Sequence, residues 1–285
     1  MQAEADKALA VVVLSYGPRR SLGDAVRSLL QQDTPAEIVV VHSGGGDVRA
    51  ALAFAGEAIR IVETPQRLLP GGARNHGIAS TRAPYVAFLA DDCVAGEGWV
   101  RQRLAAHRAG ARAVSSALAC HKPADPVALA AHLSLYVRRM PRTDAQVALR
   151  YGVSYDRDVF AHDGAFREDL ESGEDTEFNQ RLAPEDAPVW APDVVTVHRG
   201  ADTLGAFFRS QLHRGRRMAV AWRALGAYDP PAVAKNAMSR TALIVRETWR
   251  VVEPRHRAAA LLSVPLIVCG NIAYAWGALR AGARA

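Results

Sequence analysis

Cysteine is scarce in this chain of 285 residues, and its scarcity excludes two classes of small stabilised fold. The three cysteines, Cys93, Cys120 and Cys269, are odd in number, widely spaced and never arranged as Cys-x-x-Cys. Neither a disulfide framework nor a structural zinc site is therefore expected. A chain without disulfides suits a reducing compartment, so we expect the folded part of this protein in the cytoplasm.

Two sequence patterns are also missing near the start of the chain, a secretory signal and a glycine-rich phosphate loop. Glu4 and Asp6 precede a short apolar run, whereas a secretory signal starts with basic residues and continues with a longer apolar stretch. Residues 15–20, which follow that run, read SYGPRR and form a poor glycine-rich phosphate loop. A nucleotidyltransferase would need such a loop directly after the first strand, so that class of enzyme is disfavoured.

Acidic residues are rare in the last third of the chain. Residues 1–198 hold 21 Lys and Arg against 25 Asp and Glu, a balance of −4, whereas residues 199–285 hold 14 against 4, a balance of +10. A basic module of this kind usually meets nucleic acid or an anionic membrane face. No recognised nucleic-acid-binding module is present, so we expect a membrane partner and no nucleic acid.

What the chain does contain is apolar sequence, 49% of its residues, which is enough to bury a sizeable core. Apolar runs predict strands, and apolar residues at helical spacing between them predict helices, the first of them with Ser21 as its N-cap. This alternation predicts a right-handed, doubly wound parallel sheet. The expected strands are 9–14, 38–41, 59–62, 85–90, 113–119, 189–192 and 194–198; the expected helices include 22–30, 48–58 and 99–108, and 123–150 is helical or irregular.

The most informative stretch is 85–93, YVAFLADDC, in which a buried strand ends in Asp91 and Asp92. Ligands of open α/β sheets bind beyond such strand ends. Two neighbouring carboxylates that are held close indicate a cation, and oxygen ligands suit Mg²⁺ or Mn²⁺. The alternative is a solvated Asp-Asp turn.

Residues 70–79, PGGARNHGIA, place two glycines at the start of a helix. Backbone amides there can approach an anionic ligand closely, and Arg74 would add a cationic fork for phosphate. The alternative is an ordinary glycine turn.

Two further patterns lie nearer the middle of the chain. Glu174 and Asp175 begin a helix, where they are either catalytic or only complement the helix dipole. His198 ends a β-branched run, and a lone histidine in such a place is more often structural than a ligand.

Together, these motifs resemble those of family 2 glycosyltransferases with the GT-A fold. The resemblance rests on the order and spacing of several short motifs between about residues 8 and 198. They are VVLSY, GGARNHGIA, FLADD, GAFRE, GEDTEF and VH.

The resemblance implies transfer of a sugar from a nucleotide diphosphate-sugar, with inversion at the anomeric carbon and help from Mg²⁺ or Mn²⁺. Carried over position by position, it assigns metal binding to Asp92 and His198 and the catalytic base to Asp175 beside Glu174. The positions matched to nucleotide-sugar contacts are Ser15, Tyr16, His42, Arg74 and Asp91.

Two positions depart from the family pattern. Ala90 stands where the family commonly has the first acid of its aspartate-rich motif, which would make metal binding depend more on Asp92 and His198. His42 stands where the second strand often ends in an aspartate for the base or ribose. These departures motivate an alternative function, a non-catalytic nucleotide-sugar-binding or assembly module.

The basic tail contains two predicted helices. Residues 204–225 interleave aromatic residues with arginines, which suits either a helix at headgroup level or one whose arginine stems cover the sheet. Residues 258–279 hold no charge but are interrupted by Pro265 and Asn271. They are just long enough to span a bilayer, and the alternatives are a monotopic or re-entrant segment or a packed or oligomer-forming helix.

We therefore expect a GT-A, Rossmann-like α/β domain over residues 1–200, with a mostly parallel sheet flanked by helices and a C-terminal helical appendage over 201–285. The donor would bind within about 1–120 and the acceptor within 121–200. The expected partners are a nucleotide diphosphate-sugar and a lipid-linked or cell-envelope glycan. The expected location is the cytoplasmic side of the inner membrane, peripheral or with a single span.

Overall fold

The computed structural model describes residues 7–17, 21–224 and 228–282 and divides into two compact units. The first, here called the sheet unit, comprises Met1–Leu118 and Ala148–Val197. The second, the helical unit, comprises Ala119–Val147 and His198–Ala285. The expectations for residues 1–6 and 18–20 concern positions outside the described part of the chain.

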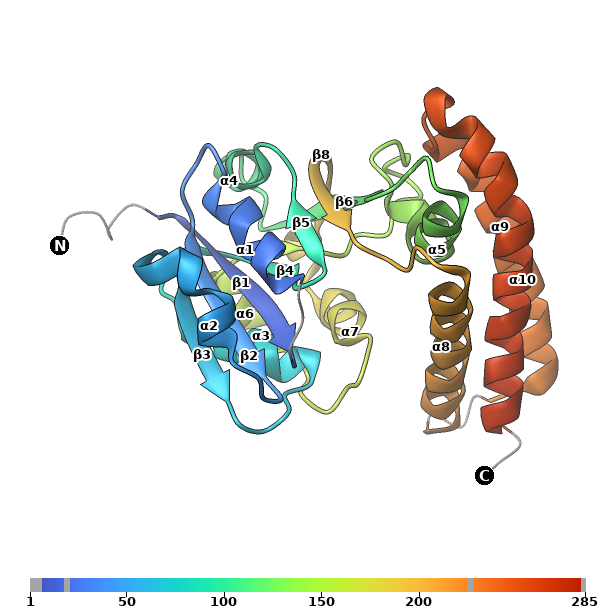
Figure 1. Cartoon of the computed structure of the whole chain (residues 1–285). Coiled ribbons are helices and arrows are strands. Elements are labelled where there is room, and N and C mark those ends of the chain that lie inside the picture. Colours follow the sequence, from blue (N-terminus) through green and yellow to red (C-terminus); the bar gives the residue numbers. More distant parts are fainter. Residues whose placement is uncertain (1–6, 18–20, 225–227, 283–285) are drawn as a thin grey trace. The chain divides into compact units, whose positions relative to one another are not determined.

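An eight-stranded sheet forms the centre of the sheet unit (Figure 1). The strand order is β3-β2-β1-β4-β7-β6-β8-β5. The strands are β1 (Leu9–Tyr16), β2 (Glu37–Ser43), β3 (Arg60–Thr64), β4 (Tyr85–Ala90), β5 (Cys93–Ala95), β6 (Ala113–Cys120), β7 (Ser154–Asp156) and β8 (Val189–His198).

The sheet is mixed. β1 pairs in parallel with β2 and β4, and β2 pairs in parallel with β3, as in a doubly wound fold. β7, however, runs antiparallel to both β4 and β6. The sequence pattern missed β7 because its three residues contain no apolar run. The two short strands expected at 189–192 and 194–198 are one continuous strand, β8.

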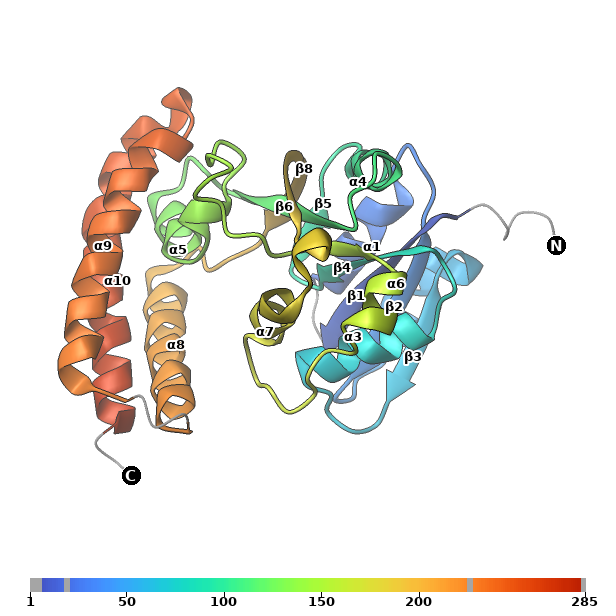
Figure 2. The same cartoon turned by 180° about the vertical axis from the view of Figure 1, so that it is seen from behind.

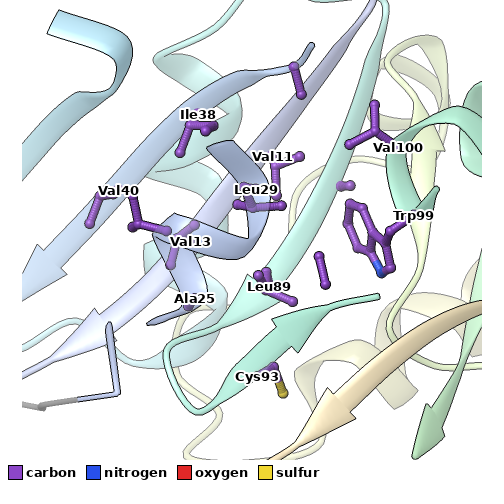
Figure 3. Packing of buried hydrophobic residues seen from close by; sticks show 14 of the residues in the cluster. Val11, Val13, Ala25, Leu29, Ile38, Val40, Leu89, Cys93, Trp99 and Val100 are labelled. Atoms are coloured by element: carbon purple, nitrogen blue, oxygen red, sulfur yellow. The ribbon is translucent and has the colours of Figure 1, made fainter. Parts of the chain in front are cut away.

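Apolar side chains fill both faces of the sheet. Val11 and Val13 of β1 lie in one core with Trp99 (Figure 3), whereas Val12 between them lies in another core with Phe178. Side chains alternate along a strand, so an uninterrupted apolar run is stable only where both faces are covered. This explains why the predicted strands contain several consecutive apolar residues.

The helices of the sheet unit follow the predicted alternation, with one correction. The expected helix 48–58 is broken into two pieces, with Gly56 at φ 50° and ψ −130°. The elements are α1 (Leu22–Leu30), α2 (Val48–Ala51), the 3₁₀ helix η1 (Ala53–Ala58), α3 (Pro70–Ala79), α4 (Trp99–Arg108), α6 (Asp158–His162), α7 (Glu174–Arg181) and the 3₁₀ helix η3 (Pro184–Asp186).

The helical unit contains three long helices that lie side by side (Figure 2). They are α8 (Leu204–Ala224), α9 (Pro230–Val251) and α10 (Arg257–Gly282); α5 (Pro126–Tyr136) and the 3₁₀ helices η2 (Val137–Arg139) and η4 (Pro254–His256) complete the unit. α5 belongs here, rather than with the first domain as expected, because it is apolar on all sides and α10 and α9 help to bury it.

Glycines allow α8 and α10 to pack backbone against backbone. A side chain at Gly277 would meet the carbonyl oxygen of Leu212 at 2.3 Å, and one at Gly215 would meet that of Tyr274 at 2.0 Å. The predicted amphipathic helix (α8) and apolar helix (α10) are therefore both present and are packed together. Within the described residues, one helix, 254–281, is long and apolar enough to cross a membrane by length and composition alone.

Candidate functional site

The carboxyl ends of β1, β2 and β4 form one edge of the sheet unit. In the strand register Ser15 is opposite His42 and Leu14 is opposite Ala90. The backbone N–H of Asp91 then donates to the carbonyl oxygen of Leu14 at 3.1 Å. Parallel strands thus bring three of the predicted donor-site residues, Ser15, His42 and Asp91, to the same edge.

His42 is buried and ties the ends of β1 and β2 together. Its Nε2 donates to the carbonyl oxygen of Gly45 at 3.0 Å, because a carbonyl can only accept. In the neutral ring Nδ1 is then the acceptor, and the Ser15 hydroxyl donates to it at 3.0 Å. His42 therefore has a structural role that an aspartate, which carries no ring N–H, would not fill in the same way.

Tyr16 presents an open aromatic ring at this edge, with 45% of its surface exposed. The guanidinium carbon of Arg67 lies 5.0 Å from the centre of the ring. Gly44, at φ 84°, lies against the ring so closely that a Cβ there would be 2.3 Å from it. Residue 44 must therefore be glycine if Tyr16 is to keep this position.

Asp91 and Asp92 directly follow β4, as predicted, and both lie in a turn. Asp91 is buried and Asp92 is half-buried, and the Cys93 thiol donates to Asp92 Oδ1 at 3.6 Å. The neighbouring Ala90 is exposed, so the missing first acid of the motif would have faced solvent.

No three metal-ligating side chains gather anywhere in the described residues. The carboxylates of Asp91 and Asp92 still fit Mg²⁺ or Mn²⁺, because such ions are commonly held by one or two carboxylates together with waters and substrate phosphates.

Arg74 of α3 forms an ion pair with Glu174, the first residue of α7. The two side chains are only 14% and 8% exposed. The guanidinium carbon of Arg74 also lies 5.4 Å from the ring centre of Phe88 in β4 and 5.3 Å from that of Phe166. Arg74 therefore joins the predicted catalytic helix to the acidic strand.

Asn75 fixes the loop that leads to α7. Its side-chain amide donates to the carbonyl oxygen of Phe166 (2.9 Å) and to Glu168 (2.8 Å), and its side-chain oxygen accepts from the N–H of Phe166 (3.0 Å). Gly71 makes this loop fit, because a Cβ there would lie 1.9 Å from the carbonyl oxygen of Arg167. The glycine expected to admit a ligand thus admits a segment of the protein itself.

Asp175 is the second residue of α7 and is half-buried. Its Oδ1 accepts from the backbone N–H of Thr176 at 2.8 Å, and no described residue donates to Oδ2. Gly173, at φ 88°, turns the chain immediately before the helix. One carboxylate oxygen is therefore held at the start of the helix, and the other accepts no hydrogen bond from the described residues.

His198 is the first residue of the second segment of the helical unit and is buried. Its ring packs edge-on against Tyr136 with 4.9 Å between centres and lies 6.0 Å from His132. The seven predicted donor and catalytic residues and Asp92 belong to the sheet unit, whereas His198 belongs to the helical unit.

Sequence reasoning missed three supporting residues, Phe88, Asn75 and Phe166. Their signal was present in the motifs quoted above, but only the fold shows that they contact Arg74 or the loop before α7. A cavity of about 870 Å³ also lies at the opposite, amino ends of β2 and β3, between Glu37, Arg60 and Thr81. None of the predicted site residues lines it.

Comparison with solved structures supports this fold. A mannosyltransferase from Pyrobaculum calidifontis, in complex with GDP-Man and Mn²⁺, matches with a TM-score of 0.58 and 18% identity over 95% of this chain and 87% of that one. S. aureus TarS 1-349 in complex with UDP matches with a TM-score of 0.55 and 13% identity over 94% of this chain and 91% of that one. The same TarS fragment with UDP-GlcNAc gives a TM-score of 0.51 and 13% identity, over 94% and 92%.

These neighbours confirm the GT-A fold, and no curated protein matches the sequence. The family model described as glycosyl transferase family 2 matches residues 10–161, which is more than half of the chain and runs from within β1 into α6. The resemblance drawn from the motifs is thereby confirmed, and the chain belongs to glycosyl transferase family 2.

Proposed function

We propose that this protein transfers a sugar from a nucleotide diphosphate-sugar to an acceptor hydroxyl by a single, inverting displacement. The observation that carries the proposal is the link from Asp91 and Asp92 through β4 to Arg74, and from Arg74 through Glu174 to Asp175. Donor-binding and proton-accepting groups are thereby held on one rigid framework, as positioning catalysis requires. Family membership supplies the class of reaction.

The nucleotide is proposed to bind at the ends of β1 and β2. The open ring of Tyr16 offers a surface on which a base or ribose can pack, and His42 and Ser15 hold the backbone beneath it. The structural neighbours were solved with GDP-Man, UDP and UDP-GlcNAc, so relatives of this fold accept different bases. His42 replaces the common aspartate, and the nucleobase that the site accepts is therefore to be identified by the titration described below.

Asp92 is proposed to hold a divalent ion together with the donor diphosphate. When bound, Mg²⁺ or Mn²⁺ would neutralise negative charge on the leaving diphosphate. Arg74, in this proposal, contributes positive charge near the same ligand while its pair with Glu174 fixes its position.

Asp175 is proposed to be the general base. Its Oδ2 would take the proton from the acceptor hydroxyl as that oxygen attacks the anomeric carbon. The bond to the diphosphate breaks on the opposite face, so one base and one displacement give inversion. Glu174 cannot serve equally well, because its carboxylate is already engaged with Arg74.

The tail is proposed to lie on a membrane, where it would meet a lipid-linked or cell-envelope acceptor. α10 exposes large apolar side chains with helical spacing, including Leu261, Ile272 and Trp276, and the tail is strongly basic. An exposed apolar face with arginines around it is typical of helices that lie in the membrane–water interface.

Packing favours an in-plane helix over a single span. Gly277 of α10 contacts the backbone of α8, and Asn271 donates to Thr241 of α9 at 2.8 Å. Crossing the bilayer would either break these contacts or draw the charged faces of α8 and α9 into lipid. We therefore favour peripheral attachment on the cytoplasmic side.

The donor proposal is tested by calorimetric titration of the full chain with UDP, GDP and TDP, each with and without Mn²⁺. We expect one nucleotide to bind in a metal-dependent way and Asp92→Ala to abolish that binding. If folded protein binds none of them, the donor-site assignment is wrong and the non-catalytic assembly module, motivated by Ala90 and His42, becomes the better hypothesis.

Membrane attachment is tested by flotation with liposomes that contain anionic lipid. The full chain should float with them, and Ile272→Glu should reduce the bound fraction because the charge would enter the apolar face. Protein that stays at the bottom of the gradient would contradict the membrane proposal without affecting the donor site.

A further inference from the structure

Two arginines in the helical unit face the same aromatic ring. The guanidinium carbon of Arg214 on α8 lies 5.7 Å from the ring centre of Tyr274 on α10, and that of Arg240 on α9 lies 5.1 Å from it. The two carbons are therefore within about 11 Å of each other. Both side chains are half-buried, so they are partly desolvated but still reachable from solvent.

Neither arginine has a carboxylate partner among the described residues. Arg214 donates to the side-chain oxygen of Gln211 at 2.9 Å, and Arg240 donates to the backbone carbonyl oxygen of Ser134. Both acceptors are neutral. The acids of the tail that form ion pairs do so elsewhere: Asp202 with Lys122, Glu247 with Arg246 and Arg250, and Glu253 with Arg255.

The pair consequently carries uncompensated positive charge. Burial, and then the charge of Arg240, lower the pKa of Arg214 to about 9, and burial also lowers the pKa of Arg240. Burying cations without a partner is costly, and folded proteins normally pair them or use them to bind an anion. The negative partner that would balance this pair is therefore expected to come from a ligand.

We propose that Arg214 and Arg240 form a phosphate-binding site between α8, α9 and α10. Guanidinium forks match phosphate oxygens in a bidentate way, and the hydrogen bond that Arg214 donates to Gln211 already fixes one of the forks. We assign to this site a phosphate group of a substrate of the transfer reaction, and this assignment rests on the proposed function.

The surroundings favour a substrate phosphate over an incidental ion. Tyr136 of α5 is close enough to Arg214 to act on its charge, and the ring of Tyr136 packs 4.9 Å from that of His198. His198 is the residue that the family resemblance assigns to the metal and diphosphate. The arginine pair and His198 thus lie in one polar cluster within the helical unit.

The first experiment is titration of the full chain with inorganic pyrophosphate in the absence of metal. Arg214→Met and Arg240→Met should each weaken binding by about tenfold or more, because each removes charge-assisted hydrogen bonds. Arg216→Met, which removes an exposed arginine on the same helix, should leave the affinity unchanged. Equal affinity of the wild type and both site variants, or no binding by the wild type, would overturn the proposal.

Folding and catalysis are separated from this result by two controls. Methionine keeps the apolar stem of arginine and removes a desolvated charge, so without ligand the variants should melt no lower than the wild type. If either variant fails to fold, Arg214→Lys or Arg240→Lys replaces it. Weaker pyrophosphate binding is again expected, because lysine lacks the guanidinium fork. Asp92→Asn and Asp175→Asn should retain pyrophosphate binding even if the proposed reaction is wrong.

The source of the phosphate is identified by two further arms. Flotation with phosphatidylcholine vesicles that contain phosphatidic acid, compared with phosphatidylserine at equal charge, reports an exposed lipid phosphate. Titration with UDP and GDP in the presence of Mn²⁺, the condition under which donor binding is expected, reports a donor diphosphate. Selective loss of either interaction in both site variants supports the phosphate site and names its source; no loss in either arm, together with unchanged pyrophosphate binding, overturns it.

Discussion

Arg74 on α3 and Glu174 at the start of α7 form a buried ion pair between residues that are 100 positions apart in the chain. The pair connects the motif before β4 with the motif that carries the proposed base. Phe88 and Phe166 lie beside the Arg74 guanidinium, so the charge pair is set between aromatic rings. Its integrity should therefore control both stability and the position of Asp175.

Replacing one member of this pair should destabilise the fold. Glu174→Gln keeps the shape but leaves Arg74 with an uncompensated charge, and we expect a loss of about 1–3 kcal/mol in the free energy of unfolding. The double variant Arg74→Met/Glu174→Leu should lose less unfolding free energy than the sum of the losses in Arg74→Met and Glu174→Leu alone. Urea unfolding measures all of them. Asp33→Asn, which breaks an exposed pair with Arg101, should hardly move the urea midpoint. If Glu174→Gln moves the midpoint as little as Asp33→Asn does, the prediction is contradicted.

Asp175→Asn should abolish catalysis without loss of donor binding. The amide cannot accept the proton of the acceptor hydroxyl, so kcat should fall by about 10²–10⁴. Transfer assays with the nucleotide-sugar chosen by titration measure this effect. Glu177→Gln changes a carboxylate on the same helix that pairs with Arg181 and should retain most activity. If Asp175→Asn keeps more than a tenth of the wild-type kcat, another residue is the base.

His42→Phe should weaken both the fold and nucleotide binding. Phenylalanine fits a buried position but leaves the Ser15 hydroxyl and the Gly45 carbonyl without their partner. We expect a loss of about 1–3 kcal/mol in unfolding free energy, together with weaker nucleotide binding. Ser15→Ala breaks only one of the two bonds and should cost less. Equal losses for the two variants in thermal unfolding would show that the bond to Gly45 contributes nothing.

His107 should make stability depend on pH between about 6.5 and 4. Burial lowers its pKa in the folded protein to about 4, from 6.5 in the unfolded chain. The unfolded state therefore binds the proton first, so the stabilisation is complete above pH 6.5 and is lost as pH falls toward 4. The loss should be on the order of 3 kcal/mol. The difference in unfolding free energy between wild type and His107→Gln should shrink over this range; a constant difference would contradict the assignment.

Gly277→Ala should loosen the packing of α10 on α8. The added Cβ would lie 2.3 Å from the carbonyl oxygen of Leu212, and such overpacking typically costs about 1–3 kcal/mol. Gly205→Ala is the matched control, because its Cβ would meet only the flexible end of Arg209 at 3.2 Å, and alanine favours helix by up to about 1 kcal/mol. Thermal unfolding should therefore show a lower melting temperature for Gly277→Ala and an unchanged or higher one for Gly205→Ala. Equal melting temperatures would mean that the two helices are not in backbone contact.

The sequence by itself determined the layered α/β fold and the family. Runs such as 9–14 are apolar at every position, which is stable only for strands covered on both faces, so they could be recognised without coordinates. Turn residues and helical spacing then supplied the alternation. Asp91, Asp92 and Asp175 could be identified because each lies within a short contiguous motif at the end of a strand or the start of a helix.

Only the tertiary structure decided which residues meet. β7 inserts antiparallel beside β4, α5 joins the tail, and Arg74 meets Glu174, because burial and charge pairing act between segments that no local period connects. The arginine pair on α8 and α9 is the clearest case. In sequence, Arg214 and Arg240 are two of the fourteen basic residues in 199–285; in the fold, they are two cations that face one ring without an acidic partner among the described residues.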